Sequence, residues 1–241
     1  AMSTGSSKSG KAGDLTLSVG ESGSAIGGAV TISAGSTAGD EEGGAVSITS
    51  GASATGASGS VVVESAEAGT AGSSGNVRVT TGNSESGRSG SVEFGSGDSQ
   101  DSTSGDVMVA AGSSGAHDGG KVSMMGGSSA IGQGGDINVQ GGQGARGGSL
   151  VLKGGRSEGS STDGNDDVSG RVLVQGGASD AGTGGSIVMK SGASNSAASG
   201  AFTMGSSDAT GARASSGDAS IGSGKSAEGD TGSVTVLTDN A

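Results

Sequence analysis

Pairs of apolar residues separated by one position recur along the whole chain. There are fifteen pairs, and most of their first members follow one another at a step of about 15 residues. The largest departures are the short step from Ile137 to Leu150 and the long steps from Leu150 to Val172 and from Phe202 to Ala219. A fixed period of this kind is the sequence signature of a repeat architecture. The pairs are Leu15/Leu17, Val30/Ile32, Val46/Ile48, Val61/Val63, Val77/Val79, Val92/Phe94, Val107/Val109, Val122/Met124, Ile137/Val139, Leu150/Leu152, Val172/Val174, Ile187/Met189, Phe202/Met204, Ala219/Ile221 and Val234/Val236.

Small residues hold fixed places around each pair. Glycine always stands two positions before the first apolar residue, from Gly13 to Gly232, and stands five positions after it in most repeats. The residue seven positions after it is always small and is most often serine, as at Ser53 or Ser179. The register therefore covers the whole repeat and not only its apolar part.

This register predicts an all-β fold. Residues i and i+2 of a strand lie on one face, so the apolar pair would face a core. Glycines at corners would supply positive φ, and the small seventh residue would lie on a second strand opposite the pair. Stacked coils would bury what one coil cannot. We therefore expect a two-sheet parallel β-solenoid, or β-helix, of about fifteen coils with about 15 residues each.

The composition of the chain resembles that of disordered chains in some respects and differs in others. Gly accounts for 56 of 241 residues and the net charge is -12, which is typical of disordered chains. The chain has no Pro, however, and its order of residues is periodic. The absence of Cys excludes disulfides and cysteine-based metal sites. No apolar run reaches the roughly 18 residues of a membrane helix, and no secretory leader is visible.

The repeat resembles two groups of proteins. The segment Gly28-Ala29-Val30-Thr31-Ile32-Ser33-Ala34-Gly35-Ser36-Thr37 is similar to Gly/Ser-rich repeats of surface proteins in microalgae and related protists, and this likeness covers nearly the whole chain. In architecture, the chain also resembles the short-coil solenoids of insect antifreeze proteins, although it lacks their Thr-x-Thr array and their cysteines. The first resemblance implies a cell-surface location but little about activity, and the second concerns architecture only.

Two groups of outward residues on the first strand are candidate interaction sites. The first three coils carry a regular hydroxyl array, the candidate ice-binding face: Thr16, Ser18, Thr31, Ser33, Ser47 and Thr49. Ordinary exposed strand residues are the alternative, because Thr and Ser suit strands. Later coils carry apolar residues outward, the candidate lateral contact: Met108, Val151, Leu173 and Val188. An exposed apolar patch can mark contact with another chain.

The long step from Leu150 to Val172 predicts a loop insertion at 157–169. It holds Glu158, Asp163, Asp166 and Asp167, whose oxygens suit Ca²⁺, although the same residues are common in turns. Calcium is the only cofactor that the sequence suggests, and a solvated turn is the alternative. Asp40, Glu41 and Glu42 form a second acidic corner, which we expect to be solvated.

No catalytic set emerges from the sequence. His117 is the single histidine and is expected at an exposed corner. Carboxylates are too scattered to nominate an acid/base pair. The net charge of -12 disfavours nucleic acid, and without Trp or Tyr there is no stacking platform for bases.

The sequence thus favours a non-enzymatic structural module. Residues 1–12 would be a cloning remnant and an N-terminal cap or lead-in, and residues 13–241 a single continuous repeat domain. We expect a rigid rod in an extracellular fibre, adhesin stalk or cell-surface coat, with ice binding as the alternative function. The expected partners are other copies or neighbouring repeats of a longer chain, or an ordered surface such as ice, without membrane insertion.

Overall fold

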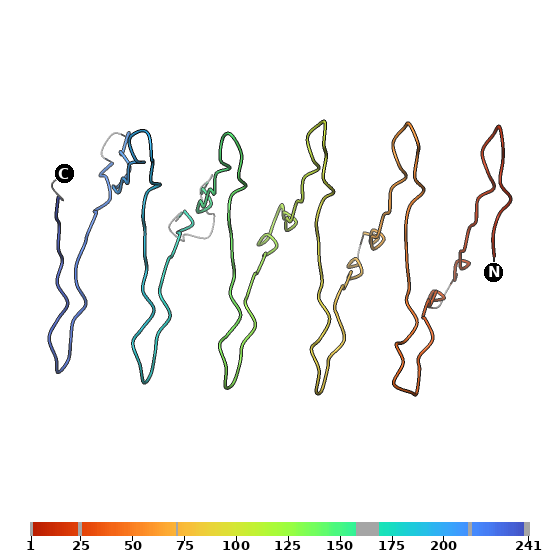
Figure 1. Cartoon of the computed structure of the whole chain (residues 1–241), viewed down its shortest axis with the longest axis horizontal. Coiled ribbons are helices and arrows are strands. Elements are labelled where there is room, and N and C mark those ends of the chain that lie inside the picture. Colours follow the sequence, from red (N-terminus) through yellow and green to blue (C-terminus); the bar gives the residue numbers. More distant parts are fainter. Residues whose placement is uncertain (1, 24–25, 71, 158–168, 212–213, 239–241) are drawn as a thin grey trace. The chain divides into compact units, whose positions relative to one another are not determined.

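The structure, a computed structural model, consists of extended segments joined by loops (Figure 1). It describes residues 2–23, 26–70, 72–157, 169–211 and 214–238, and none of these residues lies in a helix or a β-strand. The prediction of a two-sheet parallel β-solenoid, or β-helix, of about fifteen coils is therefore wrong. Its physical basis is also missing, since no hydrogen bond between described residues pairs one extended segment with another along its length.

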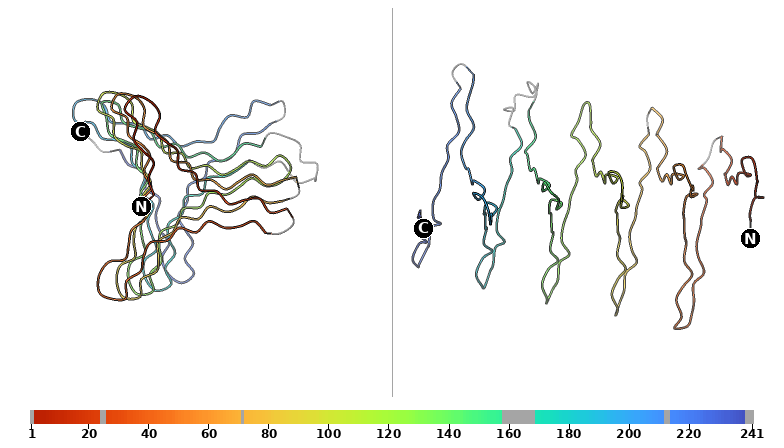
Figure 2. Two further views of the ribbon diagram at one scale, coloured as in Figure 1. Left: turned by 90° about the vertical axis from the view of Figure 1, so that its right-hand side faces the viewer. Right: turned by 45° about the horizontal axis from the view of Figure 1, so that its top comes forward.

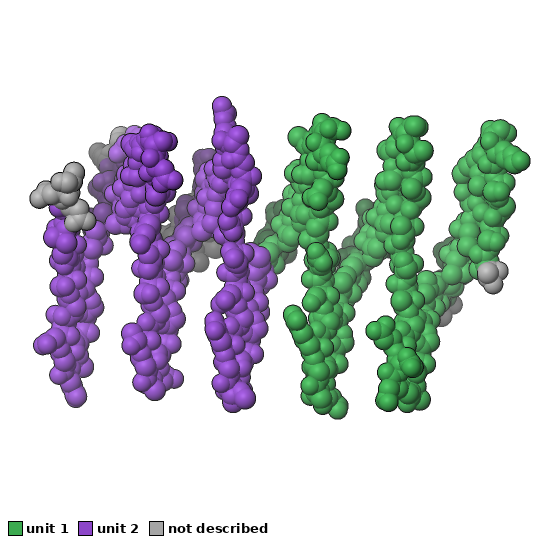
Figure 3. All heavy atoms as spheres, viewed as in Figure 1, with its two compact units in different colours: residues 1–122 green, residues 123–241 purple. Residues whose placement is uncertain are grey.

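The chain divides into two units, Ala1–Val122 and Ser123–Ala241 (Figure 3). The boundary falls inside the extended segment that carries Val122 and Met124. Each unit repeats one local arrangement, in which an extended segment with an apolar pair leads into a loop and the next extended segment leads out of it. Figure 2 shows these segments and loops from two further sides.

Among the described residues, eight of the fourteen connections between successive apolar pairs are loops closed at their base by an equivalent hydrogen bond. The glycine two positions before an apolar pair donates its N–H to the carbonyl oxygen of the glycine five positions after the preceding first apolar residue. In the loop 35–44, for example, Gly44 N–H donates to Gly35 O at 2.9 Å. The other seven loop bases join Gly51/Gly59, Gly112/Gly120, Gly127/Gly135, Gly142/Gly148, Gly155/Gly170, Gly177/Gly185 and Gly192/Gly200, at 2.8–2.9 Å.

The small residue at the seventh position caps the bend of the loop. In the loop 51–59, the Ser53 hydroxyl accepts a hydrogen bond from Gly56 N–H at 2.9 Å, and residues 54–56 form the bend. A short hydroxyl side chain that bonds to nearby backbone stabilises a turn. The expected second strand with inward serines is therefore wrong. The same cap is made by Thr37, Ser84, Ser99, Ser114, Ser129, Ser179, Ser194 and Ser226.

Some of the glycines stand at a close approach of two segments, and none of the described ones needs positive φ. None of the described glycines has a φ in the left-handed region, so the expected corners with positive φ are wrong. At the loop base of Gly177 and Gly185, a Cβ on the neighbouring Gly176 would overlap the carbonyl oxygen of Gly185. The two segments meet there backbone to backbone, and this base has no room for a Cβ at Gly176.

The described residues form no core. None of them is buried, and the four that are half-buried lie at or beside loop bases: Ser50, Gly141, Ser157 and Gly176. The chain exposes 23727 Å². A globular protein of 21.9 kDa exposes about 9,300 Å², and a fully extended chain of that mass exposes about 32,000 Å². The single chain therefore keeps most of its surface in water.

Candidate functional site: the exposed apolar pairs

The apolar pairs are the repeated feature that the structure leaves uncovered. Val92 keeps 46% of its surface exposed and Phe94 keeps 74%. The same order holds in every pair for which both values are known, so the first member is always the less exposed one. Each of these pairs therefore presents two apolar side chains that keep close to half or more of their surface exposed, at the same spacing.

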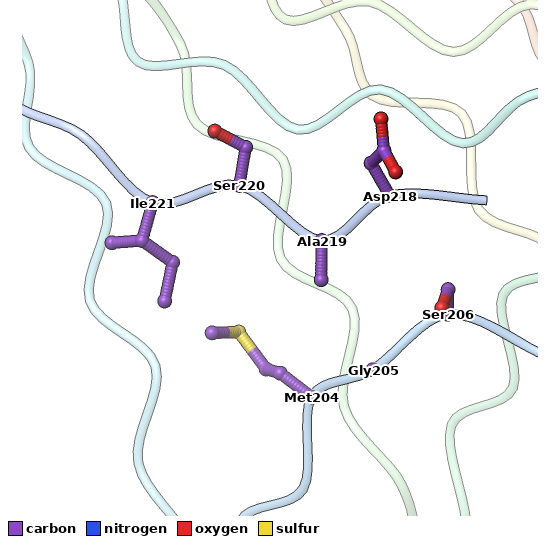
Figure 4. Close-up of a pocket in the computed structure, with 7 residues that line it drawn as sticks. All are labelled: Met204, Gly205, Ser206, Asp218, Ala219, Ser220 and Ile221. Carbon is purple, nitrogen blue, oxygen red and sulfur yellow. The ribbon is translucent and has the colours of Figure 1, made fainter.

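The loop that joins 202–206 to 217–222 shows why the first member is partly covered. Met204, Ala219 and Ile221 point toward one another across the two segments, while Asp218 and Ser220 point to the other side (Figure 4). The i, i+2 alternation expected from the sequence is present here. The second member of one pair thus faces the first member of the next pair.

The same place is hollow. These segments line an open hollow of about 320 Å³. Ala219 is the one first member that is neither branched nor aromatic, and its short side chain leaves part of the space between Met204 and Ile221 unfilled. The hollow is therefore a local gap in the series of apolar pairs.

The candidate ice-binding residues lie exposed on three successive extended segments. Thr16 and Ser18, Thr31 and Ser33, and Ser47 and Thr49 each flank the second apolar residue of their segment. These segments are not strands, so the expected flat sheet face does not bring the six hydroxyls together. Whether they bind ice stays a prediction.

The candidate lateral-contact residues are strongly exposed. Met108, Val151, Leu173 and Val188 keep at least 65% of their surface in water. They lie on four separate extended segments, each beside the apolar pair of that segment. They therefore add a third apolar side chain to the pair in those repeats, and their role in contact stays a prediction.

The charged and titratable candidates do not form a site in the described chain. The calcium candidates Glu158, Asp163, Asp166 and Asp167 lie outside the described residues. Asp40, Glu41 and Glu42 are exposed at a bend. His117 is exposed in the bend 115–117, where its backbone N–H donates to the Ser114 hydroxyl at 3.0 Å. Among the described residues, no three acidic, histidine or cysteine side chains gather as metal ligands would.

The ends of the predicted insertion are held together at a loop base. Gly170 N–H donates to Gly155 O at 2.8 Å, and Ser157 N–H donates to the Ser169 hydroxyl at 3.3 Å. The shortest repeat step is closed in the same way, between Gly142 and Gly148 at 2.9 Å. Changes in repeat length therefore fall within loops.

Sequence reasoning did not find the loop bases. The signal was present, because glycine precedes every apolar pair and Gly-Gly stands four and five positions after the first apolar residue in four repeats, at 126–127, 141–142, 154–155 and 176–177. In the first three of these, as at Gly176, a Cβ on the first glycine would overlap a carbonyl oxygen of the opposite segment. Two glycine rows in a fixed register indicate two backbones in contact.

Comparison with known proteins adds no relative. No protein-family model, curated protein or solved structure matches this chain. The resemblance to Gly/Ser-rich surface repeats and to insect antifreeze proteins therefore stays a prediction. No helix in the part of the chain that the structure describes is long and apolar enough to cross a membrane.

Proposed function

We propose that this chain is a non-enzymatic structural module that builds an extracellular fibre, an adhesin stalk or a cell-surface coat. The observation that carries the proposal is the exposure of the apolar pair in every repeat. Fully burying one Val, Leu or Ile side chain is worth about 1.5–3 kcal/mol. A gain of this kind, available again in each repeat, favours association along the length of the chain.

The uniformity of the repeats supports the same role. In repeat proteins each unit contributes its own stability and a contact with its neighbour, so length grows by adding units. The same loop base recurs in eight connections between apolar pairs, and most of these loops also carry the capping hydroxyl. Repeated units of this kind suit a structural protein, whose length matters more than the chemistry of any one binding site.

Electron microscopy of the purified chain tests this function. We expect elongated particles or filaments of constant width. Compact round particles, or separate chains without a preferred shape, would contradict a fibre, stalk or coat. Thermal hysteresis of the same sample tests the alternative from the sequence: a freezing gap with faceted ice crystals would move the function to ice binding.

A further inference from the structure

We propose that each chain associates with further copies of itself along its whole length, and that extended segments of different copies hydrogen-bond to one another, repeat against repeat. The inference rests on the proposed function, because it names the partner from which the assembly is built. Three observations carry it: the exposed area, the unpaired backbone and the period.

The exposed area is too large for a local contact. The chain exposes 23727 Å², about 14,000 Å² more than a globular chain of its mass. A standard protein–protein interface covers about 800 Å² on each partner, which is about a twentieth of that excess. A partner that covers a substantial part of the excess has to follow the chain from repeat to repeat.

The backbone between two loop bases of the described chain also offers free hydrogen-bonding groups. Between the loop bases at Gly44 and Gly51, the N–H and C=O groups of residues 45–50 make no hydrogen bond to any described residue. Extended backbone with free N–H and C=O groups pairs readily with another extended chain. The partner therefore needs extended segments of its own and not only an apolar surface.

The period identifies the partner as a copy. The partner must present an extended segment with an apolar pair at each repeat of this chain. A second copy does so because it has the same repeats. The shortest and the longest step keep the segments on either side joined, because the loop bases Gly142/Gly148 and Gly155/Gly170 close as the other loop bases do.

Particle mass is the first test. Chains labelled with ¹⁵N and unlabelled chains are unfolded, mixed and refolded together, and their masses are measured by light scattering and native mass spectrometry. We expect multiples of 21.9 kDa that contain both labels. A particle with the mass of one chain would overturn the proposal, since the chain's own repeats would then have covered one another.

Hydrogen exchange of the same sample tests the backbone pairing. In the isolated chain, the hydrogen-bonded amides are those of loop bases and caps, such as Gly59 and Gly56. If copies pair, the amides of residues 45–50 become protected as well. Rapid exchange of 45–50 in a particle of several copies would overturn the pairing.

Charge substitutions test which side of the segment is covered. The double variant Val122→Asp/Ile137→Asp places two carboxylates at apolar first positions, and the control Ser123→Asp/Asn138→Asp places them one residue further on. We expect the first variant to raise the concentration of half-dissociation on the order of a hundredfold, and the control to change it by less than about threefold. Equal shifts would overturn the proposal. Protection of the Gly59 amide in both variants verifies that loops still form.

The outcomes separate this inference from the proposed function. An assembly of several copies that is round and compact keeps the inference and removes the fibre, stalk or coat. An elongated particle with the mass of one chain keeps the structural function and removes the self-association.

Discussion

The contact of two backbones at a loop base makes a sharp prediction for Gly176→Ala. A Cβ at Gly176 would overlap the carbonyl oxygen of Gly185 and lie 2.9 Å from its carbonyl carbon. The opposite segment therefore has to move away. That movement pulls on the hydrogen bond from Gly185 N–H to Gly177 O, which is 2.8 Å long.

The cost follows from these two effects. Forcing an extra carbon into a closed contact costs about 1–3 kcal/mol, and a weakened backbone hydrogen bond costs about 1 kcal/mol. Replacing glycine by alanine recovers about 0.4–1 kcal/mol by restricting the unfolded chain. We expect a net loss of about 2 kcal/mol at this loop base.

The chain offers a matched control in the next residue. At Gly177 a Cβ would have nothing within 4 Å, and the φ of this glycine is not in the left-handed region. Gly177→Ala therefore keeps the contact and gains only the restriction of the unfolded chain. The assay is the exchange rate of the Gly185 amide, whose protection we expect to fall on the order of thirtyfold in Gly176→Ala and to stay or rise slightly in Gly177→Ala.

An opposing outcome is physically reasonable and would refute the argument. In the loop 35–44, Ala34 holds the repeat position that Gly176 holds in the loop 177–185. Gly44 lies on the opposite segment there. If the base of the loop 177–185 shifts to that geometry at little cost, the Gly185 amide will be equally protected in both variants. The loop base would then accommodate a Cβ, and close approach of the backbones would not require the Gly-Gly pairs.

Four further results are expected. Ser179→Ala removes the hydroxyl that accepts Gly182 N–H at 2.8 Å, so protection of that amide should fall about fivefold; Ser179→Thr is the control. Ala219→Val fills part of the 320 Å³ hollow and should raise the urea concentration of half-dissociation, whereas Ala219→Ser should not. An insertion of two glycines in the bend 144–146 lengthens a loop at a cost of about a few tenths of a kcal/mol, so the particle mass should stay the same. A changed particle mass would contradict the view that association depends on the extended segments and not on the loops. Thermal hysteresis should be absent, and Thr31→Lys should leave ice growth unchanged; faceted crystals that become round in this variant would restore the ice-binding hypothesis.

The local register of the repeat could be predicted from the sequence. The alternation that places Ala219 and Ile221 on one side of their segment is the one that the i, i+2 spacing indicates (Figure 4). This feature depends on residues close in sequence, which side-chain spacing constrains directly.

The partner of the apolar pairs could not be predicted. A period shows that each unit needs a neighbour with the same apolar row, but the row is identical whether the neighbour belongs to the same chain or to another copy. The solenoid prediction assumed the first case. The exposure of Val30 and Ile32, at 52% and 71%, shows that the single chain leaves more than half of each side chain uncovered.

Serine and glycine were misassigned for a related reason. A small hydroxyl residue suits a tight inward position and also the cap of a turn, and only the structure places the Ser53 hydroxyl on Gly56 N–H. Glycine likewise suits positive φ and close backbone contact. In both cases the residue type fits two local structures, and contacts across the loop decide between them.

Where the loop base forms, its geometry does not depend on the length of the loop that it closes. Loops of quite different length, 142–148 and 155–170, close with hydrogen bonds of 2.9 and 2.8 Å between glycines in the same register. The extended segments on either side therefore keep the spacing that a partner has to match, whatever the loop contains. Association then depends on the segments, and the loops can differ in length and charge from repeat to repeat without changing it. Residues of the acidic bend at Asp40–Glu42 are free to vary in a way that Val30 or Val46 is not.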